Sequence, residues 1–262
     1  MIGAIIGDTV GSIYEFDNVK IKNFKVFTKD TRFTDDSVLT IALMDWILHS
    51  KEKTTLSAAN YLKKWARKYP NSGFGGMFYY WMKSEDMQPY NSCGNGSAMR
   101  ISAIGWAAKD EEDLKDLVLA ATACTHNHPE GIKGALVTAT CIYKALRGAT
   151  KDELRKYIIS QYPEVETLDY EELRRTYYHG PEICQLTVPE ALFCFLISND
   201  FEDCLRTTIS IGGDCDTTSA ISCAIAEAYY KKIPTYLKKG VRKRLKSDMI
   251  EIVDEFQKVF SF

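Results

Sequence analysis

The chain has 262 residues, 45% of them hydrophobic, and its 33 lysines and arginines nearly balance its 35 aspartates and glutamates. This length suffices for one well-filled core, so we treat residues 1–262 as a single domain. A formal net charge of −2 argues against general binding to nucleic acid or an anionic membrane, and no segment has the roughly 20 apolar residues that span a bilayer. Because the eight cysteines are scattered and no basic leader is present, we expect a cytoplasmic protein with free thiols.

Apolar residues recur at helical spacing along most of the chain, whereas the alternation typical of strands is nearly absent. Beyond an N-terminal helix, the pattern predicts helices at 37–48, 56–68, 111–123, 131–146, 151–161, 189–198, 201–212, 219–230 and 239–259. The runs at 37–48 and 219–230 are apolar over most of their surface, which predicts buried central helices. Segments 18–33, 69–97 and 162–186 lack such a pattern, and we expect irregular loops there. The predicted fold is therefore all-α.

The N-terminal helix has a glycine at every fourth position, at Gly3, Gly7 and Gly11, and Glu15 continues this spacing. Residues four apart lie on the same helix face. Because a glycine inside a helix costs about 1 kcal/mol relative to alanine, three on one face predict that another backbone passes very close. We expect Glu15 to face inward with them, the alternative being a solvated glutamate.

Two acidic clusters, Thr34-Asp35-Asp36-Ser37 and Gly213-Asp214-Cys215-Asp216-Thr217, each precede one of the buried helices. One aspartate in each is explained as a helix cap. A pair of carboxylates beside hydroxyls, however, is the ligand chemistry that hard divalent cations prefer. If the fold joins the clusters, compensating cations are needed, and two divalent ions are the simplest solution. The sequence thus predicts a metal-dependent hydrolase.

The segment from Ser92 to Arg100 is a glycine-rich turn that leads into a helix. Backbone N–H groups in such a turn suit a phosphate, although the segment is neither a Walker A loop nor a dinucleotide fingerprint. A plain helix cap is the alternative. We expect Arg100 to pair with an internal carboxylate rather than with a phosphate. For His126, a structural hydrogen bond and a contact to a diphosphate both stay open.

In this order, five motifs resemble the ADP-ribosylglycohydrolase family, which includes the dinitrogenase reductase-activating glycohydrolase. The motifs lie at 3–8 continuing to Glu15, and at 33–37, 94–100, 125–129 and 212–218, so the resemblance spans nearly the whole chain. It implies a compact orthogonal helical bundle with a central cleft for two Mg²⁺ ions, or Mn²⁺. The implied reaction is hydrolysis of the glycosidic bond between ADP-ribose and an acceptor on a protein or a small molecule.

Carried over to matching positions, the resemblance implies a role for each site residue. The metal ligands would be Thr34, Asp35, Asp36, Asp214, Asp216 and Thr217. The substrate-binding residues would be Ser92, Gly94, Asn95, Gly96, His126 and Gly213. Glu15, Asp35 or Asp36 would transfer the proton. The chain departs from the family pattern at Ser37, at Cys93 and in the lack of a proline after Met99-Arg100.

Two other functions stay open on the sequence. One is a metal-dependent phosphohydrolase, although such centres usually include histidine and neither acidic cluster has one. The other is a non-catalytic ADP-ribose-binding module, against which the intact acidic clusters argue. The sequence does not identify the acceptor, which could be arginine, serine, another side chain, a nucleobase or a metabolite. It also leaves the oligomeric state open, with a monomer favoured.

Overall fold

A computed structural model describes residues 1–178 and 180–260, in which fifteen α-helices and one 3₁₀-helix occur. In chain order they are α1 (Gly3–Gly11), α2 (Asp35–His49), α3 (Thr55–Lys68), α4 (Gly76–Lys83), α5 (Gly96–Met99), α6 (Ser102–Ala107), α7 (Glu111–Thr122), α8 (Pro129–Leu146), α9 (Lys151–Gln161), η1 (Pro163–Thr167), α10 (Tyr170–Thr176), α11 (Cys184–Ile197), α12 (Phe201–Ile211), α13 (Cys215–Tyr230), α14 (Thr235–Arg242) and α15 (Ser247–Val259). The described residues contain no strand beyond an isolated bridge between Gly94 and Ile183. The all-α prediction is confirmed.

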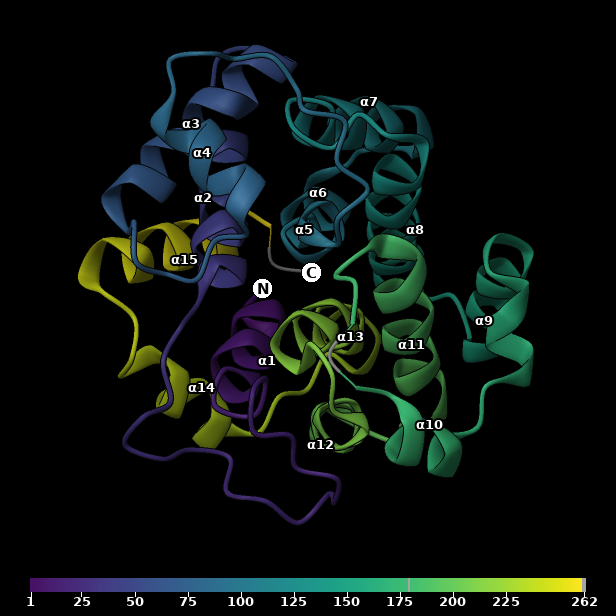
Figure 1. Ribbon diagram of the computed structural model, residues 1–262. Helices are drawn as coiled ribbons and strands as arrows, with labels where there is room; N and C mark the ends of the chain where they lie inside the picture. Colours follow the sequence, from purple (N-terminus) through teal and green to yellow (C-terminus); the bar gives the residue numbers. More distant parts are fainter. Residues whose placement is uncertain (179, 261–262) are drawn as a thin grey trace.

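Helices α1 and α13 lie side by side near the middle of the molecule (Figure 1). All residues of α1 are buried. A Cβ atom on Gly3, Gly7 or Gly11 would lie 2.4, 2.2 or 2.4 Å from a backbone atom of α13, far inside van der Waals contact. The predicted close approach of another backbone is therefore confirmed. Because Gly11 contacts Asp216, the C-terminal end of α1 lies beside the start of α13.

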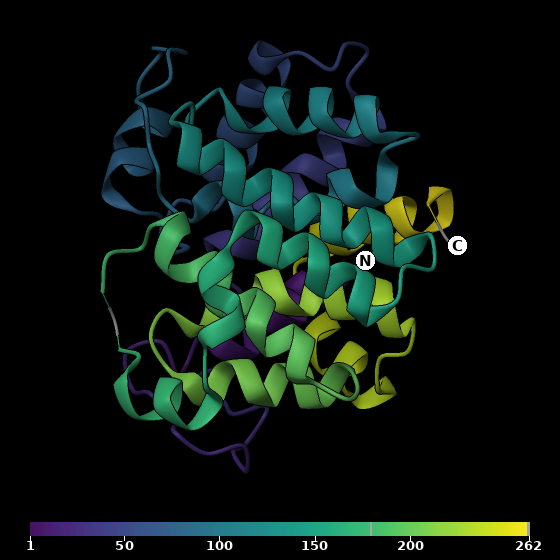
Figure 2. The ribbon, with the colours of Figure 1, turned by 90° about the vertical axis from the view of Figure 1, so that its right-hand side faces the viewer.

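The remaining helices surround this pair. Helix α13 also packs against α8, α11 and α12, while α2 packs against α1, α3 and α15. Figure 1 shows α2 and α3 on one side of the pair and α8 and α11 on the other, and Figure 2 shows the molecule from the side of α8 and α11. One cluster of buried hydrophobic side chains runs through these helices. No helix in the described part of the chain has the length and apolar character to cross a membrane.

Most predicted helices are present, with ends shifted by at most four residues. Helix α11 begins at Cys184 rather than at Pro189, because buried neighbours such as Val188 and Leu192 hold the proline inside the helix. The predicted helix at 239–259 is two helices, α14 and α15, separated by a turn in which Leu245 is buried. The expected loops at 69–97 and 162–186 contain the short helices α4, η1 and α10.

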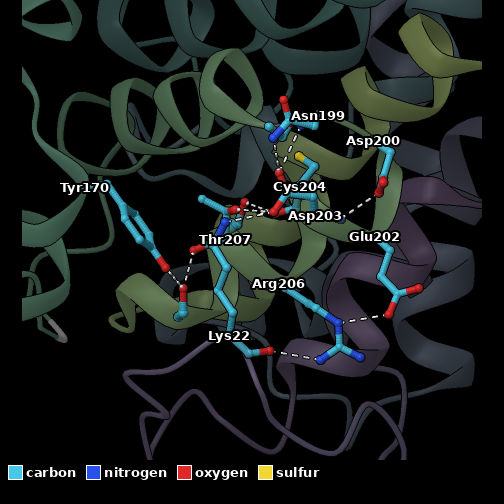
Figure 3. Close-up of polar contacts among 12 residues, drawn as sticks. Lys22, Tyr170, Asn199, Asp200, Glu202, Asp203, Cys204, Arg206 and Thr207 are labelled. Carbon is cyan, nitrogen blue, oxygen red and sulfur yellow. Dashed lines mark hydrogen bonds and ion pairs between the residues drawn. The ribbon is translucent and has the colours of Figure 1, made fainter.

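The segment between α1 and α2 is irregular, as predicted, but it is tied firmly to α12. Arg206 donates hydrogen bonds to the carbonyl oxygens of Lys22 (2.9 Å) and Phe24 (3.2 Å) while it also binds Glu202 (2.9 Å). The ammonium group of Lys22 pairs with Asp203 at 2.8 Å. Figure 3 shows Glu202, Asp203 and Arg206 of α12 together with Lys22 of the loop. These contacts hold the segment between α1 and α2 against α12.

Candidate active site

A cleft of about 350 Å³ opens at the N-termini of α2 and α13. Its lining includes twelve of the residues that the sequence singled out: Glu15, Thr34, Asp35, Asp36, Ser92, Gly94, Asn95, Gly96, His126, Asp214, Asp216 and Thr217. These residues come from five separate stretches of the chain. The fold therefore joins the two acidic clusters and the glycine-rich turn in one cavity.

Carboxylates in the cleft and directly beneath it form two groups of three. Oxygen atoms of Asp8, Asp36 and Asp216 lie within 4.8 Å of one another, and so do oxygen atoms of Glu15, Asp214 and Asp216. Asp216 belongs to both groups. Oxygen-rich clusters of this kind suit magnesium or manganese. Two cation positions that share Asp216 are thus compatible with the arrangement.

Hydroxyl groups adjoin these carboxylates. The Thr217 hydroxyl donates to Asp36 Oδ2 at 3.3 Å, and the Thr217 backbone N–H donates to Asp216 Oδ1 at 2.9 Å. The Thr34 hydroxyl lies 3.5 Å from oxygens of both Asp36 and Asp216. Asp36 Oδ1, by contrast, is buried and has no hydrogen-bond partner in the described structure. An orphaned buried carboxylate oxygen fits a site whose remaining ligand is a cation.

Asp8 is a site residue that the sequence analysis did not select. It is fully buried on α1 and accepts hydrogen bonds from the backbone N–H and the hydroxyl of both Thr34 and Ser37. Asp8 therefore fixes the N-terminus of α2 against α1. Its one signal in the sequence is a lone carboxylate in an otherwise apolar, glycine-striped helix.

The crowding of buried acids shifts their pKa values upward. Burial raises the pKa of Asp8 to about 6, although hydrogen bonds from Ser37 and Thr34 oppose the shift. Burial, followed by the charges of neighbouring aspartates, raises the pKa of Asp35, Asp36 and Asp216 well above the ordinary value. Like charges out of water favour protonation unless a cation compensates them. The electrostatics of the cleft therefore favour a bound cation.

Glu15 reaches the cleft by a route that differs from the prediction. Helix α1 ends at Gly11, so Glu15 lies in the following turn and is half-buried. The Asn18 side chain holds this turn, since its Nδ2 donates to the carbonyl oxygens of Glu15 (2.9 Å) and Gly213 (3.1 Å). Its Oδ1 accepts from the Gly213 N–H at 2.8 Å. Asn18 thus joins the Glu15 turn to the turn that carries Asp214.

Gly213 does not line the cleft. Its φ of +68° is the left-handed conformation that favours glycine. A Cβ atom there would lie 2.4 Å from the ring of Tyr177. In this structure Gly213 therefore shapes the turn before Asp214, and its contact with a substrate stays a prediction.

The glycine-rich turn faces the carboxylates from the opposite wall. Asn95 Nδ2 donates to Asp214 Oδ2 at 2.6 Å, which links the turn to the acidic group. The Gly94 N–H donates to Ser92 Oγ at 3.0 Å. A Cβ atom on Gly96 would lie 3.2 Å from Nε2 of His126, so the missing side chain leaves this histidine room at the wall. The helix that follows, α5, has only four residues, so the turn rather than a helix dipole would have to bind an anion.

Two buried cationic or titratable side chains complete that wall. Burial, with the nearby charge of Arg100, lowers the pKa of His126 well below its ordinary value, so the imidazole is neutral at physiological pH. Arg100 is fully buried and donates through Nη2 to the hydroxyl of Thr125 at 2.7 Å. Its Nε and Nη1 have no partner in the described structure. The expected ion pair between Arg100 and an internal carboxylate is therefore wrong.

The cleft also has a wall that the sequence analysis left as an unassigned loop. It is lined by Asn71, Ser72, Gly73 and Gly75, from the connection between α3 and α4, and by Gly76 and Met77, the first residues of α4. The close succession of glycines at 73–76 was the only signal of this role.

The model of the ADP-ribosylglycohydrolase family matches residues 1–261. ADP-ribosylhydrolase ARH3 of Mus musculus is 26% identical, with 88% of this chain and 82% of that protein covered. The ADP-ribosyl-[dinitrogen reductase] glycohydrolase of Rhodospirillum rubrum is 25% identical, with 87% of this chain and 83% of that protein covered. The ADP-ribosylarginine hydrolase Tri1 of Pseudomonas putida (strain GB-1) is 24% identical, with 88% of this chain and 69% of that protein covered.

A solved structure described as an ADP-ribosylglycohydrolase-related protein complex has the same fold. It superposes with a TM-score of 0.66 at 22% sequence identity, and 98% of this chain and 95% of that chain are covered.

Proposed function

The chain belongs to the ADP-ribosylglycohydrolase family, and from this premise we propose that it hydrolyses the glycosidic bond between ADP-ribose and an acceptor in a reaction that requires two divalent cations. The observation that carries the proposal is the convergence of both acidic clusters and the glycine-rich turn on one cleft. The wall that carries the acidic clusters suits cations, and the opposite wall, formed by the glycine-rich turn, suits an anionic ligand. A glycosidase of the usual kind instead relies on a carboxylate pair alone.

The residues present fit a pair of magnesium ions. Asp36, Asp214, Asp216 and Thr217, with Thr34 and Asp35 beside them, offer only oxygen donors, and the two carboxylate groups contain neither histidine nor cysteine. The orphaned Asp36 Oδ1 and the raised pKa values of the aspartates also favour cation binding. Bound Mg²⁺ or Mn²⁺ would neutralise the carboxylates, orient ribose hydroxyls and polarise a water molecule.

The other wall would hold the diphosphate. Backbone N–H groups of the glycine-rich turn and the neutral ring of His126 would contact it, and Arg100 would contribute positive charge from beneath the surface. Asn95, bonded to Asp214, would keep a fixed spacing between the diphosphate and the carboxylates. The anomeric carbon of the distal ribose would then face the acidic wall.

Asp35 is our candidate for transferring the proton. It lines the cleft but lies outside both groups of three carboxylates, and its raised pKa brings it closer to the pH at which a general acid or base works best. Glu15, which is also partly exposed, is the alternative. Asp35→Asn and Glu15→Gln, both assayed at saturating Mg²⁺, separate the two, because only loss of the proton-transfer group removes a limb of the pH–rate profile.

The proposal is tested with ADP-ribose linked to arginine, serine and a small acceptor, assayed before and after treatment with EDTA. We expect turnover to stop in EDTA and to return with Mg²⁺ or Mn²⁺. Asp216→Ala should lower kcat by at least about 100-fold, because it removes the carboxylate common to both groups, while far-UV circular dichroism stays unchanged. Undiminished turnover in EDTA would reject the metal requirement, and hydrolysis of simple phosphate esters alone would indicate a phosphohydrolase.

The cytoplasm is the proposed compartment, supported by eight free cysteines that a reducing environment would preserve. Labelling of the thiols in intact cells with a membrane-permeant reagent, compared with an impermeant one, tests this assignment.

A further inference from the structure

A second depression, of about 470 Å³, adjoins the acidic cleft. It is formed by the segment before α2, the α3–α4 connection and the α14–α15 connection, and its charged lining residues are all basic: Arg32, Lys68, Arg244 and Lys246. We name this depression the basic groove. Arg32, Asn71 and Ser72 line both the groove and the cleft, so the two are continuous.

Most of the positive charge in the basic groove is not neutralised by an ion pair among the residues that the structure describes. Lys68 pairs with Asp248. Arg244 donates to three backbone carbonyl oxygens at 2.8 to 3.1 Å, which leaves its charge without a carboxylate. Arg32 and Lys246 are exposed and form no ion pair with any residue that the structure describes. A groove with three unpaired cations attracts anionic groups.

The basic groove opens at the acidic end of the cleft. Arg32 lies two residues before Thr34, and a Cβ atom on Gly73, next to Ser72, would lie 3.6 Å from Asp35 Oδ1. No residue of the glycine-rich turn lines the groove. If the diphosphate lies on that turn and the anomeric carbon faces the carboxylates, the acceptor points away from the turn and toward the groove.

We propose that the basic groove binds an acidic polypeptide segment that flanks the ADP-ribosylated side chain of a protein substrate; this inference rests on the function proposed above. The substrate class is thus an ADP-ribosylated protein with aspartate or glutamate next to the modified residue. The position of the groove, beyond the anomeric carbon, makes it a site for the acceptor rather than for ADP-ribose.

The aromatic residues of the groove argue against a nucleic acid as the occupant. Single strands bind through bases stacked on open aromatic faces. Tyr69 is instead stacked on Trp65, with ring centroids 6.0 Å apart, and Phe33 meets it edge-on at 5.7 Å. Both rings are half-buried and pack against each other, with Tyr69 also packed on Trp65. The groove therefore offers positive charge without a stacking platform, which suits carboxylates.

The test uses three peptides of equal length that carry one ADP-ribose on the linkage the protein hydrolyses fastest. Their flanking residues are aspartates, serines or lysines. We expect kcat/KM to be highest for the aspartate peptide and this preference to shrink with added salt. Lys246→Glu should lower kcat/KM for that peptide by roughly five- to tenfold, mainly through KM, because an exposed attraction becomes a repulsion. The serine peptide should change by less than about twofold.

Lys243→Glu is the matched control, since it makes the same charge change on the same connection at an exposed residue that does not line the groove. Lys246→Gln, which removes the charge without reversing it, guards against a folding defect. The proposal is overturned if the wild type shows no preference among the three peptides, if Lys243→Glu matches Lys246→Glu, or if an ADP-ribosylated oligonucleotide is the better substrate.

Failure of the proposed function is a separate result. If no ADP-ribose linkage is hydrolysed, peptides with the same three flanking sequences are prepared with ADP-ribose on arginine, and their binding is measured by fluorescence anisotropy. Tighter binding of the aspartate peptide to the wild type than to Lys246→Glu would then support the groove without catalysis, and equal binding would reject it.

Discussion

Replacing Gly7 by alanine tests whether the contact between α1 and α13 holds the candidate active site in register. The new Cβ atom would lie 2.2 Å from the carbonyl oxygen of Ser219 and 2.6 Å from the backbone nitrogen of Ala220. Ordinary van der Waals contact begins near 3.4 Å, so the two helices would have to separate by about 1.2 Å. Both obstructing atoms belong to helix backbone and have no rotamer by which to move away.

The expected loss of stability follows from two opposing effects. Alanine gains about 1 kcal/mol over glycine in a helix interior, whereas overpacking a core against rigid neighbours costs about 1–3 kcal/mol and occasionally more. Because the clash here is with backbone, we expect a net loss of about 2 kcal/mol in the free energy of unfolding. Asp8 is the next residue along α1, so it moves relative to Asp216. Misplacement by about 1 Å should lower kcat by roughly 100-fold.

Unfolding in urea and steady-state turnover, measured on the same preparation, check this prediction. The control for stability is Gly76→Ala at the start of α4, where a Cβ atom meets nothing within 4 Å. That substitution should leave stability unchanged or raise it. A Gly7→Ala protein with wild-type stability and wild-type kcat would refute the reasoning, because the helix contact would then tolerate a methyl group.

Two further predictions concern the acidic cleft. The pKa of Asp8 is about 6 in the folded protein and near 3.9 in the unfolded chain, so protonation of Asp8 favours the folded state. The free energy of unfolding of the metal-free protein should therefore fall by about 3 kcal/mol as the pH rises from about 4 through 6. Added Mg²⁺ should reverse this loss. Thermal unfolding in EDTA against Mg²⁺ measures both, and a metal-free protein that gains stability across that range would contradict the pKa shift. Asn18→Asp removes the Nδ2 donor that bonds the carbonyl oxygens of Glu15 and Gly213. The free energy of unfolding should therefore fall by about 1–3 kcal/mol, and kcat should fall while KM changes little. Asn18→Gln, which keeps the amide but lengthens the side chain, is a second variant. Normal kcat in both variants would show that the link between the two turns does not matter for catalysis.

Part of the site was predictable because its signals are local. The spacing of Gly3, Gly7 and Gly11 places them on one helix face and predicts the close approach of another backbone. The structure shows that this backbone belongs to α13. The acidic clusters were recognisable because carboxylates adjoin hydroxyls at helix starts, and the structure puts both in one cleft. Their ligation of magnesium stays a prediction.

Other features were beyond local reasoning. Glu15 was expected on the face of α1, yet the helix ends at Gly11, and Glu15 enters the cleft from a turn that Asn18 holds. Arg100 was expected to bind a carboxylate, yet its hydrogen bonds go to groups in the segment around Thr125. Each outcome depends on which distant segment packs against the residue, and helical periodicity carries no information about that.

The sequence by itself determined the all-α architecture, the close helix contact and the two acidic clusters, because each depends on residues only a few positions apart. The tertiary structure alone decided that Asp8 joins the acidic wall, that Asp216 is common to both carboxylate groups and that a basic groove lies beside them. Such features join atoms that are far apart in sequence, as in the Thr217–Asp36 hydrogen bond across 181 residues. Their positions are set by the packing of α1 against α13, which brings the ends of distant helices within a few ångströms of one another.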